Sequence, residues 1–216
     1  MIEEKRKNKF SLLYAVVGVC TLIIAVVGAT YAYYQASATG NISGTAGGGA
    51  PVLTVTKEST GATGNLIPID MDATTLSKAA KGWNGTAVGT AWDATKACKD
   101  KNGNSVCQIY SVTVKNTSSN TQSFNIGVTS LSGTNTPNVD VVAMGTSNIQ
   151  VSAATSIKGT EDGVAKAVSI AANATCSKYY FMVIIKNLNS AQTDNGNYSG
   201  VVTAVSTVGA EVKAQF

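Results

Sequence analysis

The stretch QIYSVTVKN, residues 108–116, decides the fold class because its apolar and polar side chains alternate with a period of two. Tyr110, Val112 and Val114 fall on one face of an extended chain, and the intervening polar side chains fall on the other. Such alternation indicates a β-strand with one buried face. The stretch QSFNIGVTS, residues 122–130, repeats the pattern, and the short polar link between the two predicts an antiparallel hairpin.

Further segments with the same alternation are separated by turn residues and predict additional strands. They are 51–57, 66–70, 139–144, 148–153, 164–171 and 198–208, and the last of these is expected to be the final strand of the domain. The segment SKYYFMVIIKN, residues 177–187, is apolar on both faces, so we expect a central strand that is covered on both sides. Together these segments predict an all-β fold, an antiparallel β-sandwich of the jelly-roll or immunoglobulin-like type.

One short helix is expected within this β domain. It should run from Ala73 to Ala80, where Asp70 or Asp72 can cap the start and Gly82 can close the end. Such caps satisfy the backbone groups that a helix leaves unpaired at its ends.

The N-terminus carries a hydrophobic run that targets or anchors the chain. Basic residues precede an uncharged stretch from Phe10 to Tyr34, which predicts either a secretory signal peptide or a transmembrane anchor helix. The run of about 25 residues is long enough to cross a bilayer as a helix. Small residues near its end offer cleavage after Ala32 or after Ala38. In either case the basic residues stay on the cytoplasmic side, and everything after Tyr34 is outside.

This run divides the chain into three parts. Residues 1–34 form the signal peptide or membrane anchor, and residues 35–51 form a spacer of small residues, with three consecutive glycines near its end, that cannot bury a core. The β-sandwich domain is expected at 52–216. We therefore expect an extracellular or cell-surface protein that uses the export machinery and a signal peptidase. If it is not cleaved, it contacts the membrane through residues 10–34.

Composition argues against two classes of function. The sequence contains no histidine, the side chain most often used for proton transfer near neutral pH and the commonest metal ligand. Four of its basic residues stand before the hydrophobic run, and the only arginine is among them, at Arg6. A nucleic-acid surface needs clustered Lys and Arg. We therefore expect neither an enzyme nor a nucleic-acid-binding protein, and we assign no catalytic, cofactor-binding or metal-binding residue.

The cysteines suggest one disulfide. Cys98 and Cys107 bracket the polar, turn-rich stretch KDKNGNSV, and export permits their oxidation. That pairing leaves Cys176 over, and a bond from Cys176 to either of the other two stays open because spacing alone does not fix connectivity. Cys20 lies in the apolar run and is interpreted as a small hydrophobic residue.

Two further features have both a functional and an ordinary interpretation. The stretch Asp100–Asn104 offers oxygen ligands as a calcium loop does, but no bidentate Glu follows and Lys101 adds positive charge, which favours an ordinary loop. Trp83 and Trp92 offer a platform for a carbohydrate, although packing is the more common role of isolated tryptophans.

The order of several short motifs resembles the TasA and camelysin family of Gram-positive surface proteins. The motifs are GATYAYYQASATGN at 28–41, PVLTV at 51–55, VTVKNTSSNTQSFNIGV at 112–128 and NYSGVVTAVSTV at 197–208. The resemblance covers most of the chain. Three departures are visible: Tyr31 replaces the usual Trp, acidic residues are absent after the aromatic pair, and the apolar run is longer.

The resemblance implies an exported protein that a dedicated signal peptidase processes, with a jelly-roll-like sandwich that in some members forms biofilm-matrix fibres. We therefore expect a surface or biofilm-matrix subunit that assembles with itself, head to tail, by strand addition. The donor is expected in the uncharged stretch that follows the cleavage site, at Tyr33, Tyr34, Ala36, Ala38 and Ile42. A disordered tether is the alternative for this stretch. The alternatives for the whole chain are a membrane-anchored pilin-like subunit and a monomeric adhesin that binds glycans.

Overall fold

The computed structural model describes residues 50–63, 65–82, 92–133, 138–188 and 198–216. The elements in these ranges are β1 (Val52–Lys57), α2 (Ala73–Lys81), β2 (Cys107–Lys115), β3 (Gln122–Gly133), β4 (Val139–Gly145), β5 (Thr160–Ile170), β6 (Tyr179–Ile185), β7 (Tyr198–Ser206) and β8 (Glu211–Gln215). The expected signal peptide or anchor at 1–34 and nearly all of the spacer lie outside these ranges. Within them, no helix has the length and apolar character needed to cross a membrane.

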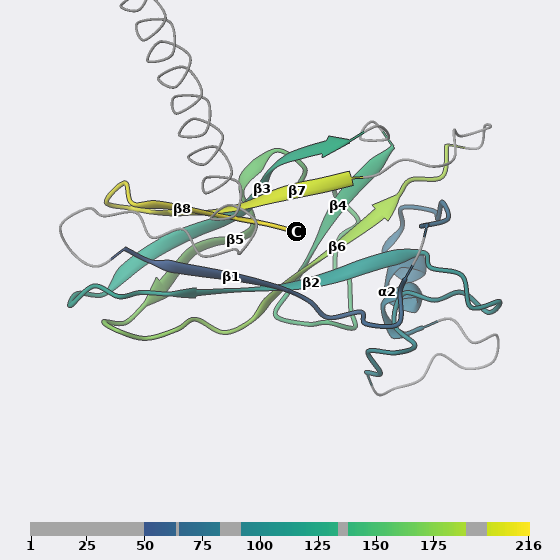
Figure 1. The fold of residues 1–216 in the computed structure, drawn as a ribbon, viewed down its shortest axis with the longest axis horizontal. Helices are drawn as coiled ribbons and strands as arrows, with labels where there is room; N and C mark the ends of the chain where they lie inside the picture. Colours follow the sequence, from purple (N-terminus) through teal and green to yellow (C-terminus); the bar gives the residue numbers. More distant parts are fainter. Residues whose placement is uncertain (1–49, 64, 83–91, 134–137, 189–197) are drawn as a thin grey trace, which may run out of the picture. The chain divides into compact units, whose positions relative to one another are not determined.

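The strands form two four-stranded antiparallel sheets that pack face to face (Figure 1). The strand order is β1-β2-β6-β4 in the first sheet and β5-β3-β7-β8 in the second. This confirms the predicted all-β sandwich. These orders correspond to the A-B-E-D and C′-C-F-G sheets of immunoglobulin-like domains. One difference is the order along the chain: β4, in the place of strand D, precedes β5, in the place of strand C′.

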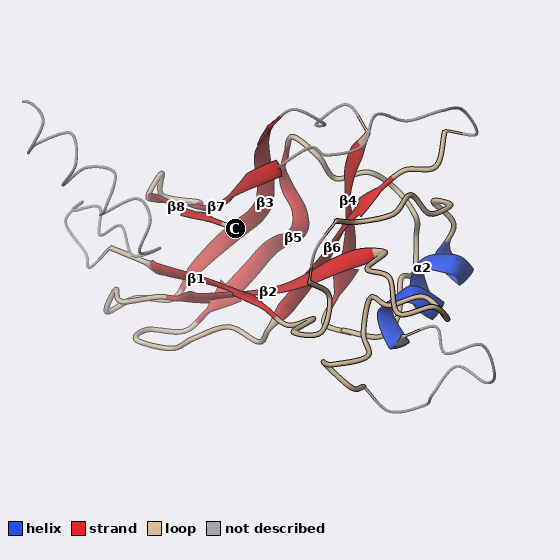
Figure 2. Ribbon diagram, turned by 45° about the vertical axis from the view of Figure 1, so that its right-hand side comes forward, coloured by secondary structure: helices blue, strands red, loops and turns tan. Residues whose placement is uncertain are grey.

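Two hydrophobic clusters cover the two faces of the first sheet. The cluster between the sheets contains Phe124 and Phe181, both fully buried, together with valines of β2, β4 and β6. The second lies on the outer face, where Met182 and Ile184 pack with Leu76 of helix α2. Figure 2 shows α2 (Ala73–Lys81) as the helix of the described domain, on the side of β2 and β6. Strand β6 is therefore apolar on both faces because both faces are buried, as its sequence predicts.

Helix α2 confirms the expected caps. The Asp72 side chain accepts a hydrogen bond of 2.9 Å from the Thr75 N–H, and Gly82 ends the helix with φ of 89° while its N–H bonds to the Ala79 carbonyl. A left-handed φ of this kind favours glycine. The buried face of the helix then covers the outer side of β2 and β6.

The predicted hairpin of 108–116 and 122–130 is wrong. Strands β2 and β3 belong to different sheets, and their apolar faces oppose each other across the core instead of lying side by side. The buried side chain of Asn116 holds the crossing, since its Nδ2 donates to the carbonyls of Ile170 and Ala171 at the end of β5. Alternation alone does not distinguish a hairpin from such a crossing.

Three other strand predictions need correction. Residues 66–70 form only a single bridge, in which Ile69 pairs with Lys186, and 148–153 form no strand. In both segments the apolar side chains, Ile69 and Val151, are buried in the cluster around α2 and not within a sheet. The segment at 198–208 is not the last strand, because β8 follows a tight turn and pairs with β7.

Candidate functional site at the edge of strand β1

A sandwich of two open sheets has four edge strands, and these decide where another chain can add. Here they are β1 and β4 in the first sheet and β5 and β8 in the second. Strand β1 lies near β8, and strand β4 lies near β5, so each edge of one sheet has an edge of the other sheet beside it. An edge with unpaired N–H and C=O groups is a template for a further strand.

Strand β1 presents a regular row of outward-pointing backbone groups. It pairs with β2 over six consecutive residues, from Val52 to Lys57, without a register shift. Because the Glu58 N–H bonds to the Ile109 carbonyl and antiparallel pairs alternate, the N–H and C=O of Leu53, Val55 and Lys57 point away from β2. None of these groups bonds to another backbone group in the described residues. We call this row the acceptor edge.

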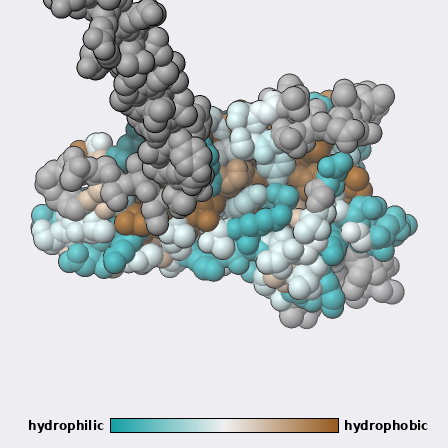
Figure 3. Space-filling model, in the orientation of Figure 1, coloured by the Kyte–Doolittle hydropathy of each residue, from teal (hydrophilic) through white to brown (hydrophobic). Residues whose placement is uncertain are grey.

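The surface beside the acceptor edge is partly apolar. Val55 and Phe216 are half-buried and pack against the core between the sheets. The Phe216 ring lies 4.8 Å from the ring of Tyr110, which is paired with Lys57 across β1 and β2. Figure 3 shows hydrophobic residues reaching the surface between the layer of β1 and β2 and the layer of β7 and β8. A strand added along β1 would cover apolar surface as well as backbone groups.

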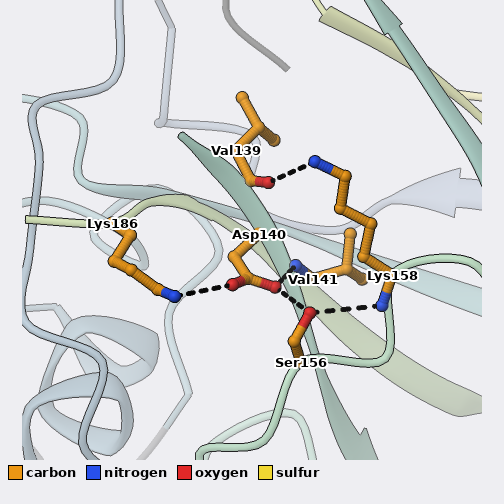
Figure 4. Close-up of polar contacts among 6 residues, drawn as sticks. All are labelled: Val139, Asp140, Val141, Ser156, Lys158 and Lys186. Atoms are coloured by element: carbon orange, nitrogen blue, oxygen red, sulfur yellow. Dashed lines mark hydrogen bonds and ion pairs between the residues drawn. The ribbon is translucent and has the colours of Figure 1, made fainter. Parts of the chain in front are cut away.

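Strand β4, at the opposite edge of the same sheet, has several of its outward groups paired internally, and Figure 4 shows the side-chain bonds among them. The Lys186 N–H bonds to the Asn138 carbonyl, so the groups of Val139 and Val141 point outward. The Val139 carbonyl accepts from Lys158 Nζ at 3.2 Å, and the Val141 carbonyl accepts from the Ile157 N–H at 2.8 Å. The Val141 N–H donates to the carboxylate of Asp140 at 2.9 Å.

The other two edges are irregular or charged. Strand β5 has two register shifts against β3, and its Ala167 has a left-handed φ of 49°. Strand β8 is only five residues long, and its exposed side chains include the ion pair of Lys213 and Glu211 at 2.9 Å. Bulges, short length and exposed charges are devices that discourage strand addition. Strand β1 is thus the edge with the most regular pairing in the described domain, and of its three outward-facing residues Val55 and Lys57 are partly exposed whereas Leu53 is buried.

The disulfide fastens the segment between β1 and β2 to the first residue of β2. Cys98 and Cys107 are joined with an S–S distance of 1.98 Å, and both are fully buried beneath α2. Cys176 is a half-buried free thiol whose Sγ accepts from the Val114 N–H at 3.1 Å. Burial raises the pKa of this thiol, which makes it a poor nucleophile near neutral pH.

Several predicted site residues lie outside the described ranges. They are the cleavage candidates Ala32 and Ala38, the donor residues Tyr33, Tyr34, Ala36 and Ile42, and Trp83. Trp92 is described and packs against the cluster around α2. The Asp100 carboxylate accepts from the backbone of Asn102 and Asn104, as in an ordinary loop. Across the described ranges, no group of three or more acidic, His or Cys side chains is placed to hold a metal ion.

The polar cluster around Asp140 was not among the features predicted from the sequence. Its only signal is an aspartate inside the apolar segment VDVVAM, where a charge contradicts the pattern of a buried strand. The partners Ser156, Lys158 and Lys186 come from two other segments of the chain. Their meeting depends on the crossing of the chain from β4 to β5, which local patterns do not specify.

Comparisons with known proteins add no family. No family model and no curated protein matches the chain. Similar solved structures include a FixG-related protein from Vibrio parahaemolyticus, 9% identical with a TM-score of 0.33, over 77% of this chain and 92% of that chain. Another is a family 123 glycoside hydrolase from Clostridium perfringens, 10% identical with a TM-score of 0.31, over 76% of this chain and 26% of that chain. At these scores neither likeness supports an argument about function.

Proposed function

We propose that the protein is an exported structural subunit of the cell surface, of the TasA and camelysin type, which assembles head to tail by strand addition at β1. The observation that carries this proposal is the acceptor edge: outward N–H and C=O groups on a strand that has a regular pairing on its other side. An added strand satisfies these groups and extends the sheet. Because donor and acceptor are different surfaces, the contact propagates into an open filament.

The donor is the segment from Tyr33 to about Ala46 of the next subunit. This segment is uncharged, and glycines at 47–49 link it to the domain. It therefore brings no charge into the apolar surface beside Val55 and Phe216. The glycines let it leave its own domain without disturbing β1, which begins at Val52.

Two features support export. The buried disulfide of Cys98 and Cys107 fits an oxidising compartment outside the cytoplasm. The hydrophobic run from Phe10 to Tyr34 supplies the export signal or membrane anchor. The proposed role is structural and adhesive, and it depends on surfaces that bind other copies of the chain.

The test compares fibre formation by protein that begins at Tyr33 with protein that begins at Pro51. Electron microscopy should show filaments only when the donor segment is present. A Val55→Pro variant of the longer protein should remain unpolymerised, because proline removes an N–H of the acceptor edge and leaves the bonds to β2 intact. Lys213→Pro is the matched control on the edge of β8 and should still polymerise. Filaments from both lengths, or from neither, would reject the segment as donor.

A further inference from the structure

We propose that Asp140, Ser156, Ile157 and Lys158 form an edge cap that prevents β4 from pairing with β4 of a second copy of the chain. The partner that the cap excludes is an identical strand, paired antiparallel about a two-fold axis. This inference concerns the edge opposite the acceptor edge. It holds whether or not β1 receives a donor strand.

Strand β4 has the properties of a strand that would associate if it were uncovered. It is seven residues long, and Val139, Val141, Val142 and Met144 are buried. Two copies aligned antiparallel would exchange backbone bonds through the outward groups of Val139 and Val141. An apolar edge strand with such groups exposed invites pairing between molecules.

The cap occupies the bonds that such pairing would use. The Asp140 carboxylate accepts from the Val141 N–H, the Ile157 N–H reaches the Val141 carbonyl, and the Lys158 ammonium reaches the Val139 carbonyl. Figure 4 shows the Lys158 ammonium at the Val139 carbonyl and the Asp140 carboxylate at the neighbouring Val141 N–H. At these three groups a second copy must break the existing bonds before it can form its own, so the exchange brings no net gain in backbone bonding there.

The cap is fixed by both sheets and does not swing freely. Ser156 forms an antiparallel bridge with Val142 of the first sheet and donates its hydroxyl to Asp140. Ile157 is only 9% exposed and packs in the core between the sheets. The Gly159 N–H bonds to the Val128 carbonyl of the second sheet at 2.8 Å. Freeing the Val141 carbonyl therefore requires that Ile157 leave the core, whereas the Val141 N–H and the Val139 carbonyl are held by the Asp140 and Lys158 side chains alone.

The cap also places charge where a dimer interface would lie. The Asp140 side chain is 10% exposed and pairs with Lys186 Nζ at 3.5 Å, and the Lys186 side chain is 42% exposed. A second copy docked on β4 would remove water from these groups in both molecules. Burying partly solvated charges is costly unless new partners replace the water.

The test uses the full-length chain in detergent and compares two double variants. Asp140→Val with Lys158→Ala removes the side-chain caps, whereas Asp162→Val with Lys166→Ala removes the same charges from an exposed pair on β5. All proteins carry Val55→Pro, so that strand addition at β1 does not contribute. Sedimentation velocity should show that the uncapped variant self-associates with a dissociation constant at least about tenfold lower than that of the control. A folded uncapped variant that stays as monomeric as the control would overturn the proposal.

A second measurement protects the test against misfolding of the uncapped variant. In the Val55→Pro background, hydrogen exchange compares two outward amides on the two edges, Val141 on β4 and Lys57 on β1. The Val141 amide should exchange at least about tenfold more slowly, because it has an internal acceptor and the partly exposed Lys57 amide has none among the described residues. Equal rates would show that β4 is not capped.

Lys158→Ala alone, which changes one exposed side chain, should already increase self-association over the Lys166→Ala control.

Discussion

Strands β1 and β4 are the two edges of one sheet, yet among the described residues only β4 has outward backbone groups paired, by residues 157–158 and by its own Asp140. The difference follows from connectivity. The chain leaves β4 and crosses to the second sheet along that side, so residues 156–158 lie against the edge they pass. The chain enters β1 from a tract of small residues at 35–49. A sheet can thus be closed at one edge by its own connection and remain open at the other.

The largest expected effect comes from proline substitutions in β1, which test which of its backbone N–H groups face β2. Thr54→Pro should lower the free energy of unfolding by about 3 kcal/mol, because the Thr54 N–H points toward β2 and proline removes that bond. Val55→Pro should cost about 1 kcal/mol or less, since its N–H points outward. Urea unfolding of both variants measures the difference. Equal losses would mean that the acceptor edge is assigned to the wrong residues.

The next effect concerns the closed edge. Asp140→Ala should lower the free energy of unfolding by about 2 to 3 kcal/mol, because the Val141 N–H, the Ser156 hydroxyl and Lys186 lose their acceptor. Asp162→Ala, in the exposed pair with Lys166, should cost less than about 0.5 kcal/mol. Thermal unfolding followed by circular dichroism compares the two. A small loss at Asp140 would show that the cluster does not hold the edge.

The next prediction concerns the disulfide of Cys98 and Cys107, which lies in the segment that joins the edge strand β1 to β2. Replacing Cys98 and Cys107 together with Ser should lower the free energy of unfolding by about 2 to 3 kcal/mol, mainly because the unfolded chain gains freedom. Mass spectrometry of an unreduced digest should find Cys98 linked to Cys107. A peptide in which Cys176 is linked to either residue would contradict this pairing.

The smallest effect is a pH dependence at the end of β1. Burial raises the pKa of Glu58, but hydrogen bonds from Lys178 and Ser111 outweigh it and hold that pKa below its usual value. Its stabilising contribution is therefore present above the unfolded pKa and is lost as pH falls through the folded one. Between roughly pH 6 and roughly pH 3, the free energy of unfolding of the unsubstituted chain should fall by about 0.5 to 1 kcal/mol more than that of the Glu58→Gln variant. Identical pH profiles of stability for the two proteins would show that Glu58 makes no such contribution.

Local sequence patterns predicted the features that depend on neighbouring residues. The alternation in β2 and β3, the burial of both faces of β6, and the Asp72 and Gly82 caps of α2 all follow from residues within one element. The crossing between β2 and β3 and the polar cluster at Asp140 join segments far apart in the chain. In 66–70 and 148–153 the strand-like alternation reflects burial under a helix, which the pattern does not distinguish from burial in a sandwich.

The uninterrupted pairing of β1 with β2 has a mechanical consequence. A force applied to the start of β1 and directed along that strand would load its backbone bonds to β2 together, over six residues. Shear of this kind requires several bonds to break at once, whereas peeling breaks them one after another. In a filament under tension, we expect the first sheet to carry the load at β1. The rate of forced unfolding would then report the strength of this one strand pair.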